Sequence, residues 1–439
     1  QERFAVGVEA ESVYRKLMRG VERLAVEVTG RTQHGSLPIY LGGILLVLVI
    51  VPGTALLTNR DWGEAHAWDT PAQAVVAALM IVGAVLTARS RRRLKAVVLS
   101  GVVGYGMALL FVLHGAPDLA LTQVLVETVT LVVFVLVLRQ LPAYFSDRPM
   151  SVTRWWRLGL GILVGLTMAG VAFAASGART ADPVSVAYPE PAVTYGGGRN
   201  IVNVTLVDIR AWDTLGEISV LVVAATGVAS LIFLITGRHG QWRPDDVIAA
   251  AAPPQAARGY RNTWLRAGRT LAPERRSIIF EVVTRLVFHV VVVYSVFLLF
   301  TGHNAPGGGF TGGLVAGLAL MVRYLAGGRH ELDEAAPVDA GLVLGAGLFL
   351  ATAAALAPAL LGGGVLQSSV IDLHIPVLGD VHLVTSIFFD MGVYLVVIGL
   401  MLDILRSLGS GIDQQGEPDD SPETVTDFGR ASRRGVESP

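Results

Sequence analysis

The sequence has 439 residues, of which 52% are hydrophobic and 16% are charged. Because soluble domains usually carry about 25% charged residues, this composition excludes an ordinary soluble protein. A net charge of −1 offers no basic surplus for nucleic acid. The absence of cysteine excludes disulfides, thiolate metal sites and cysteine nucleophiles. The histidines form no zinc motif, so we expect neither a structural metal nor a cofactor.

Ten apolar stretches are long enough to cross a bilayer, which takes roughly 20 residues. The expected fold is therefore all-α, a polytopic transmembrane protein with about ten spans. The expected spans are 38–57, 71–88, 96–114, 119–138, 158–176, 217–236, 278–300, 310–326, 341–361 and 384–405.

The distribution of Lys and Arg predicts the orientation of these spans. With the N-terminus inside, 29 of the 34 Lys and Arg residues fall in inside segments and four in outside segments. Positive residues collect on the cytoplasmic side of membrane proteins. We therefore expect both termini to be cytoplasmic.

Both ends of the chain differ from the spans. Apolar residues in 11–31 recur every three or four positions, which predicts an amphipathic helix on the membrane surface or on a partner, or a solvated linker helix. The chain begins with Gln, so we expect that an N-terminal part is processed or omitted. The Ala-, Pro- and Arg-rich segment 238–275 is a candidate linker, and the polar tail 411–439 is expected to be disordered.

Glu127 lies in the middle of the apolar span 119–138. A charge at the centre of a bilayer costs about 2.5–3.5 kcal/mol, and intramembrane carboxylates often serve ion pathways. We favour a protonatable relay for Glu127. The alternative is a structural, protonated side chain that is hydrogen-bonded to a neighbouring helix.

A second acidic group precedes the span 217–236. Asp208, Arg210, Asp213 and Glu217 lie within VDIRAWDTLGE, and the last two carboxylates share a helical face. The simpler interpretation is a helix cap formed by Asp213 or Thr214, but a cap accounts less well for Glu217.

The last four spans carry further candidates. Glu281, Arg285 and His289 are spaced by four in one span, which fits either an internal ion pair or a proton relay. Asp390 is a single carboxylate on the outer half of the last span, whereas Asp403 and Arg406 are expected to form a terminal ion pair at its inner end.

Two connections and one glycine-rich span also stand out. LHGAPDLALTQ (113–123) brings His114 and Asp118 close together, and TGHNAPGGGFTGGL (301–314) contains His303. The second lacks the context of a phosphate-binding loop, so we expect an irregular turn or a broken helix start buried against protein. GVVGYG (101–106) predicts close helix packing rather than a π-bulge.

These motifs resemble those of the Mrp-type multisubunit sodium/proton antiporters. GAPDLALTQVLVET (115–128) and NVTLVDIRAWDTLGEISVL (203–221) are similar to signatures in the C-terminal part of the large A subunit. Residues 276–318 resemble the start of the small B subunit, and 386–405 resemble its last helix.

The resemblance implies a fold like the membrane arm of complex I and a chain that joins the rear of the A subunit to the B subunit. The implied domains are a trailing segment of an antiporter-like domain, a three-span hydrogenase D-like module, a two-span hydrogenase E-like module with a long outer loop, the linker, a four-span domain like the B subunit and the tail. In chain order these are residues 1–62 for the trailing segment, 63–150 for the D-like module, 151–237 for the E-like module, 238–275 for the linker, 276–410 for the B-like domain and 411–439 for the tail.

The resemblance further implies part of a secondary transporter rather than an enzyme, in the bacterial cell membrane. It would exchange cytoplasmic Na⁺ for external H⁺, with the antiporter-like domain of the A subunit and other small membrane subunits as partners. The family's essential carboxylates match Glu127 and plausibly Asp213 and Glu217, with transient Na⁺ near the last two. A membrane-arm subunit of a hydrogenase-linked or complex I-like pump, or a scaffold subunit without its own ion path, is the alternative.

Overall fold

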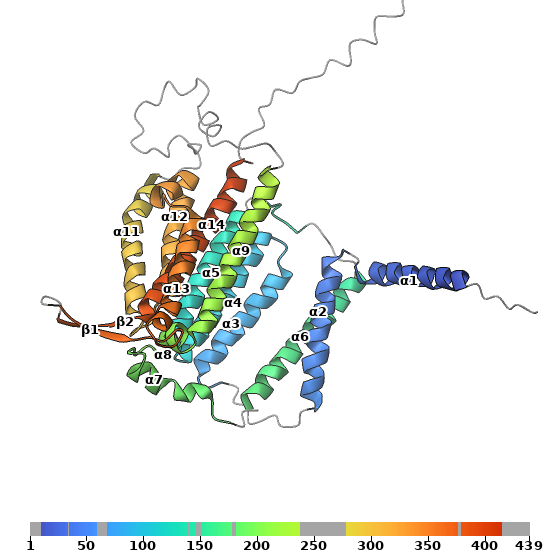
Figure 1. The fold of residues 1–439 in the computed structure, drawn as a ribbon. Coiled ribbons are helices and arrows are strands. Elements are labelled where there is room, and N and C mark those ends of the chain that lie inside the picture. The colour runs from blue at the N-terminus through green and yellow to red at the C-terminus, as the bar shows by residue number, and fades with distance from the viewer. Residues whose placement is uncertain are drawn as a thin grey trace, which may run out of the picture. The chain divides into compact units, whose positions relative to one another are not determined.

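A computed structural model describes residues 10–33, 35–58, 68–138, 141–145, 151–177, 181–237, 278–375 and 379–414 (Figure 1). Ten of the helices in these ranges are long and apolar enough to cross a membrane. They fall where the apolar stretches predicted them, which confirms the all-α, multi-pass architecture. The expected linker lies outside the described residues, as does the tail beyond Gln414.

The chain forms two compact units, of which the first comprises residues 1–69 and 146–183. It contains α1 (Ala10–Thr32), α2 (Leu37–Thr58) and α6 (Ser151–Gly177). The predicted amphipathic helix is α1, and its apolar residues are exposed. Helix α2 packs against α6 where Gly170 leaves room for Leu56.

The second unit comprises residues 70–145 and 184–439. Its first three helices, α3 (Pro71–Arg89), α4 (Arg93–Leu113) and α5 (Pro117–Leu138), pack in chain order. Glycines of α4 allow the close approach that the sequence predicted. A Cβ on Gly106 would collide with Met80 of α3, and a Cβ on Gly101 would lie 2.9 Å from Leu131 of α5.

Besides α12 (Gly309–Ala335), this unit contains four more long helices, the last of which contacts all the others. They are α9 (Ala211–Gly237), α11 (Ile278–Thr301), α13 (Ala340–Leu360) and α14 (Ser386–Gln414). Most of α12 is buried because its small residues let neighbours approach: Gly313 faces Val397 and Gly317 faces Met401 of α14.

Helix α12 is longer than the predicted span 310–326 and is broken at Gly327 and Gly328. The φ angle of Gly328 is +69°, a left-handed value that glycine adopts without steric cost. Beyond this break, Asp333 accepts a hydrogen bond from Arg406 at 3.3 Å. Arg406 therefore forms an ion pair with Asp333, and its charge also acts on Asp403, the partner that the sequence predicted.

Several short elements were not predicted. Between α6 and α9 lie η1 (Val184–Ala187), α7 (Pro189–Thr194), α8 (Ile201–Val204) and the π-helical turn η2 (Thr205–Ile209). Strands β1 (Val370–Ile375) and β2 (Gly379–Val384) form an antiparallel hairpin that begins with the pair Val370 and Val384. The predicted last span, 384–405, overlapped this hairpin by one residue.

Candidate functional site

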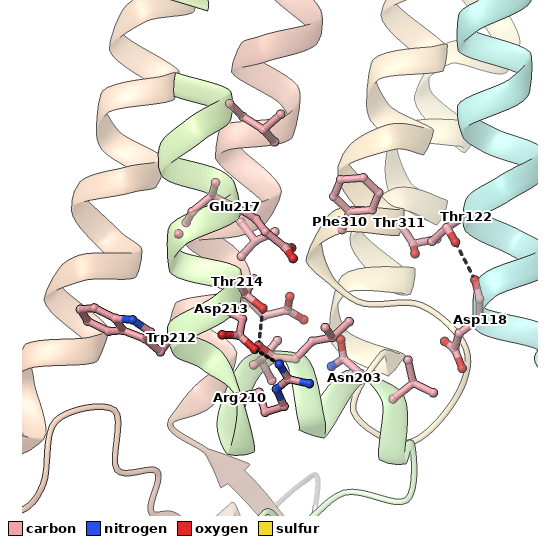
Figure 2. A pocket seen from close by; sticks show the side chains of 18 of the residues that line it. Asp118, Thr122, Asn203, Arg210, Trp212, Asp213, Thr214, Glu217, Phe310 and Thr311 are labelled. Atoms are coloured by element: carbon pink, nitrogen blue, oxygen red, sulfur yellow. Dashed lines mark hydrogen bonds and ion pairs between the residues drawn. The ribbon is translucent and has the colours of Figure 1, made fainter. Parts of the chain in front are cut away.

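A cavity of about 1060 Å³ opens in the second unit at the end where α5, α9, α12 and α14 begin (Figure 2). Its wall is mostly apolar, with Leu, Val, Ile, Trp and Phe side chains. Four carboxylates and one guanidinium interrupt this wall: Asp118, Asp213, Glu217, Asp390 and Arg210. We call this site the acidic cavity.

The π-helical turn and the first turn of α9 supply one side of the acidic cavity. Arg210 forms an ion pair with Asp213. The Thr214 hydroxyl donates to the Leu206 carbonyl at 2.6 Å. Since α9 begins at Ala211, Asp213 and Thr214 lie inside its first turn. The capping interpretation is therefore wrong.

Glu217 lies one turn further along α9, on the face of Asp213. Its side chain is directed into the acidic cavity, toward Phe310 and Thr311 of α12 (Figure 2). The residue is exposed, and within the described part of the chain its carboxylate has no hydrogen-bond or ion-pair partner. Glu217 is thus an exposed carboxylate in the wall of the acidic cavity.

Asp390 of α14 lies at the floor of the acidic cavity and is 4% exposed. Its Oδ1 accepts the backbone N–H of Gly309 at 2.8 Å, and the side chain of Asn203 also donates to it. The start of α12 carries a partial positive charge that stabilises an anion. A Cβ at Gly309 would collide with Asp390, so glycine is required for this contact.

Asp118 ties three distant segments together at the edge of the acidic cavity. Its Oδ1 accepts the Gly307 N–H at 3.1 Å and the Asn200 side-chain amide at 3.1 Å. The same amide donates to the carbonyls of Gly302 and Ala305, both at 2.9 Å. This arrangement, which we call the Asn200 clasp, confirms that the glycine-rich connection is an irregular turn packed against protein.

The other predicted residues at this end do not line the acidic cavity. A ring nitrogen of His303 lies 2.6 Å from the Gly196 carbonyl, and one of His114 lies 2.8 Å from the Leu110 carbonyl. Asp208 accepts a hydrogen bond from the Ser368 hydroxyl at 2.6 Å.

Glu127 also lies away from the acidic cavity. Nine residues separate it from Asp118 on α5, which is two and a half turns, so the two carboxylates lie on opposite faces of the helix. The Glu127 carboxyl group is half-buried against Gly104 of α4. It therefore contacts a neighbouring helix of the same unit.

The opposite end of α12 holds a cluster of opposite charges, which we call the Arg–Glu cluster: Glu281, Arg285, Arg323, Glu331 and Glu334. Arg285 pairs with Glu331 and lies 3.7 Å from Glu281 and 3.5 Å from Glu334. The predicted pairing of Glu281 with Arg285 is therefore confirmed. His289 contributes only a ring nitrogen 3.2 Å from the Arg285 carbonyl.

The sequence interpretation missed three members of this cluster, Arg323, Glu331 and Glu334. Arg323 lies 3.2 Å from Glu331 and 5.4 Å from the centre of the Phe288 ring. No local signal placed Arg323 and Glu331 together, because the break at Gly327 and Gly328 interrupts the helical periodicity between them.

Among the described residues, no group of three or more His, Asp or Glu side chains is arranged to hold a metal ion.

Comparisons with known proteins match nearly the whole of this architecture. The family model described as "Domain related to MnhB subunit of Na+/H+ antiporter" matches residues 279–403. The models for the D and E subunits of MBH match residues 78–143 and 152–241, respectively. The Na⁺/H⁺ antiporter B subunit of Alkalihalophilus pseudofirmus is 37% identical over 131 residues, which are 30% of this chain and 91% of that protein. The chain belongs to the family of Mrp-type antiporter subunits.

Two longer matches show that this family member combines parts of the A and B subunits. A probable K⁺/H⁺ antiporter A/B subunit of Rhizobium meliloti is 30% identical over 387 residues, covering 85% of this chain and 36% of the relative. The structure of the Mrp complex from a Dietzia species matches with a TM-score of 0.73 and 34% identity, covering 94% of this chain and 42% of that chain. The chain thus spans less than half of these longer relatives.

Proposed function

We propose that this chain is one membrane subunit of a larger antiporter complex that exchanges a monovalent cation, Na⁺, for protons. The observation that carries the proposal is the convergence of Asp213, Glu217 and Asp390 in one large cavity. Four carboxylates face one guanidinium there, so the wall carries an excess of negative charge. A cleft of one sign with low-dielectric walls concentrates ions of the opposite sign.

The acidic cavity would act as a cation vestibule. Na⁺ takes several oxygen ligands, and carboxylates at broken helices can supply them. Glu217 is the accessible ligand, and the hydroxyl of Thr311 adds an oxygen on the facing helix. Arg210 holds Asp213 and limits the negative charge of the site. Asp390 is held by neutral donors, so its charge also attracts a cation.

Glu127 would serve as a separate, protonatable relay in the same chain. It lies near the middle of a membrane-spanning helix, about 14 Å from the level of Asp118. A carboxyl group that lies within the membrane and packs against a neighbouring helix is the type of group expected on a proton route. Asp118, His114, Asp208 and His303 would then hold the architecture around the acidic cavity.

The proposal includes sidedness and partners. Lys and Arg concentrate in the segments expected inside, so the acidic cavity would face the exterior of the bacterial cell membrane and both termini the cytoplasm. The domain boundaries expected above are part of the proposal, in which α6 and α9 of the E-like module belong to different compact units. The antiporter-like domain of the A subunit and the other small subunits would complete the transport path.

The test is cation-dependent dissipation of a proton gradient by the complete complex in vesicles. Glu217→Gln and Asp390→Asn should each reduce the rate at low Na⁺, and Glu127→Ala should abolish exchange while assembly continues. Glu190→Gln, which alters an exposed carboxylate on α7, is the matched control. Unchanged exchange in the cavity variants would reject the vestibule, and loss of assembly with Glu127→Ala would favour a scaffold.

K⁺ is the second candidate cation, because a relative that matches 85% of this chain is named a probable K⁺/H⁺ antiporter A/B subunit. Parallel assays with Na⁺ and K⁺ on the same vesicles would discriminate between the two.

A further inference from the structure

The carboxyl group of Glu127 occupies the space that a side chain at position 104 would need. A Cβ on Gly104 would collide with Glu127, first of all with its Oε2 atom. The adjacent pair, Tyr105 Oη and Thr128 Oγ1, lies 2.9 Å apart and joins α4 to α5 at this level. The Glu127 carboxyl group therefore rests in a notch on α4 that exists only because residue 104 is glycine.

Two other glycines of α4 show how specific this notch is. Gly101 faces the side chain of Leu131, one turn after Glu127 on α5, and Gly106 faces Met80 of α3. Both neighbours are apolar, so these glycines serve ordinary helix packing. Of the three, Gly104 alone borders an ionisable group.

We propose that Gly104 is a positioning residue for Glu127, holding its carboxyl group between α4 and α5. Alanine at this position would move the far end of a flexible side chain and leave both backbones in place. The displaced carboxyl group would leave the notch and exchange protons from a different environment. The effect of Gly104 on transport rests on the proposed relay role of Glu127, whereas the energetic coupling between Gly104 and Glu127 does not depend on that role.

The first test is a stability cycle on the purified complex. Gly104→Ala should lower the unfolding temperature by a few degrees in the wild-type background. With Glu127→Ala present, the same change should raise it, because the collision is gone and alanine favours a helix over glycine. Gly101→Ala should have the same effect in both backgrounds. An equal effect of Gly104→Ala in both backgrounds would overturn the proposal.

The second test is the pH profile of exchange in vesicles. Gly104→Ala should displace the profile by about 1 pH unit, while Gly106→Ala should leave it in place. The titratable side chain that α4 brings to this level is Tyr105. From α12, Tyr324 packs with Leu136, which lies about 14 Å beyond Glu127 along α5.

The stability cycle and the pH profile test separate parts of the proposal. If Glu127→Ala abolishes exchange, an unmoved pH profile in Gly104→Ala would refute the positioning role. If Glu127→Ala leaves exchange intact, the proposed relay fails, and the stability cycle still decides whether Gly104 holds Glu127.

Discussion

Asp390 and Glu331 are both almost completely buried, with 4% and 0% exposure, yet different groups hold them. In the acidic cavity, Asp390 accepts hydrogen bonds from a backbone N–H and from the amide of Asn203. In the Arg–Glu cluster, Glu331 lies between the guanidinium groups of Arg285 and Arg323. Neutral donors leave a negative charge in place, whereas arginines cancel it.

This difference separates a site that can attract cations from one that holds helices together. The Arg–Glu cluster links α11 to both sides of the break in α12, and two guanidinium groups there face three carboxylates, one of which is about half exposed. The acidic cavity keeps an unbalanced negative charge next to an open space. A count of intramembrane acids could not have distinguished the two.

Removal of Glu331 should produce the largest loss of stability. Glu331→Ala would leave two arginines without their shared carboxylate, and breaking a buried ion pair costs about 3–5 kcal/mol. Denaturant unfolding or complex yield would measure the loss. Glu334→Gln is the control, because the Glu334 side chain is 49% exposed and such pairs contribute about 0–1 kcal/mol. Equal effects of the two variants would contradict a structural role of the cluster.

Disruption of the Asn200 clasp should come next. Asn200→Ala removes the donor to Asp118, Gly302 and Ala305, and also the cap of α8, so we expect a loss of about 1–3 kcal/mol. The unfolding temperature would report it. Asn304→Ala loses one exposed hydrogen bond to the backbone of Arg199 and should cost less. A clasp variant as stable as this control would show that the acidic cavity is held by other contacts.

The smallest effect on stability is expected for Arg210→Gln. Arg210 and Asp213 are about half exposed, so their ion pair contributes about 0–1 kcal/mol. Loss of the guanidinium should instead make the acidic cavity more negative and raise the apparent affinity for the cation severalfold in exchange assays. An affinity that falls or stays constant would argue against a cation vestibule.

Several features of this fold followed from the sequence alone. Ten spans could be counted because a helix that crosses the bilayer must satisfy its own backbone hydrogen bonds and needs an apolar stretch of about 20 residues. The pairing of Glu281 with Arg285 followed from their spacing on one helix. The opposite faces of Asp118 and Glu127 were also available from helical periodicity, because nine residues make two and a half turns.

The tertiary structure decided which charges meet. The contact of Asp390 with Gly309, the Asn200 clasp and the pairing of Arg285 with Glu331 join residues between 46 and 189 positions apart. No local pattern encodes such pairs, because they depend on which helix faces pack together. The local periodicity of the sequence determined the membrane helices and the faces of each one, whereas packing between helices determined which acids are neutralised, which one rests on Gly104 and which ones open into the acidic cavity.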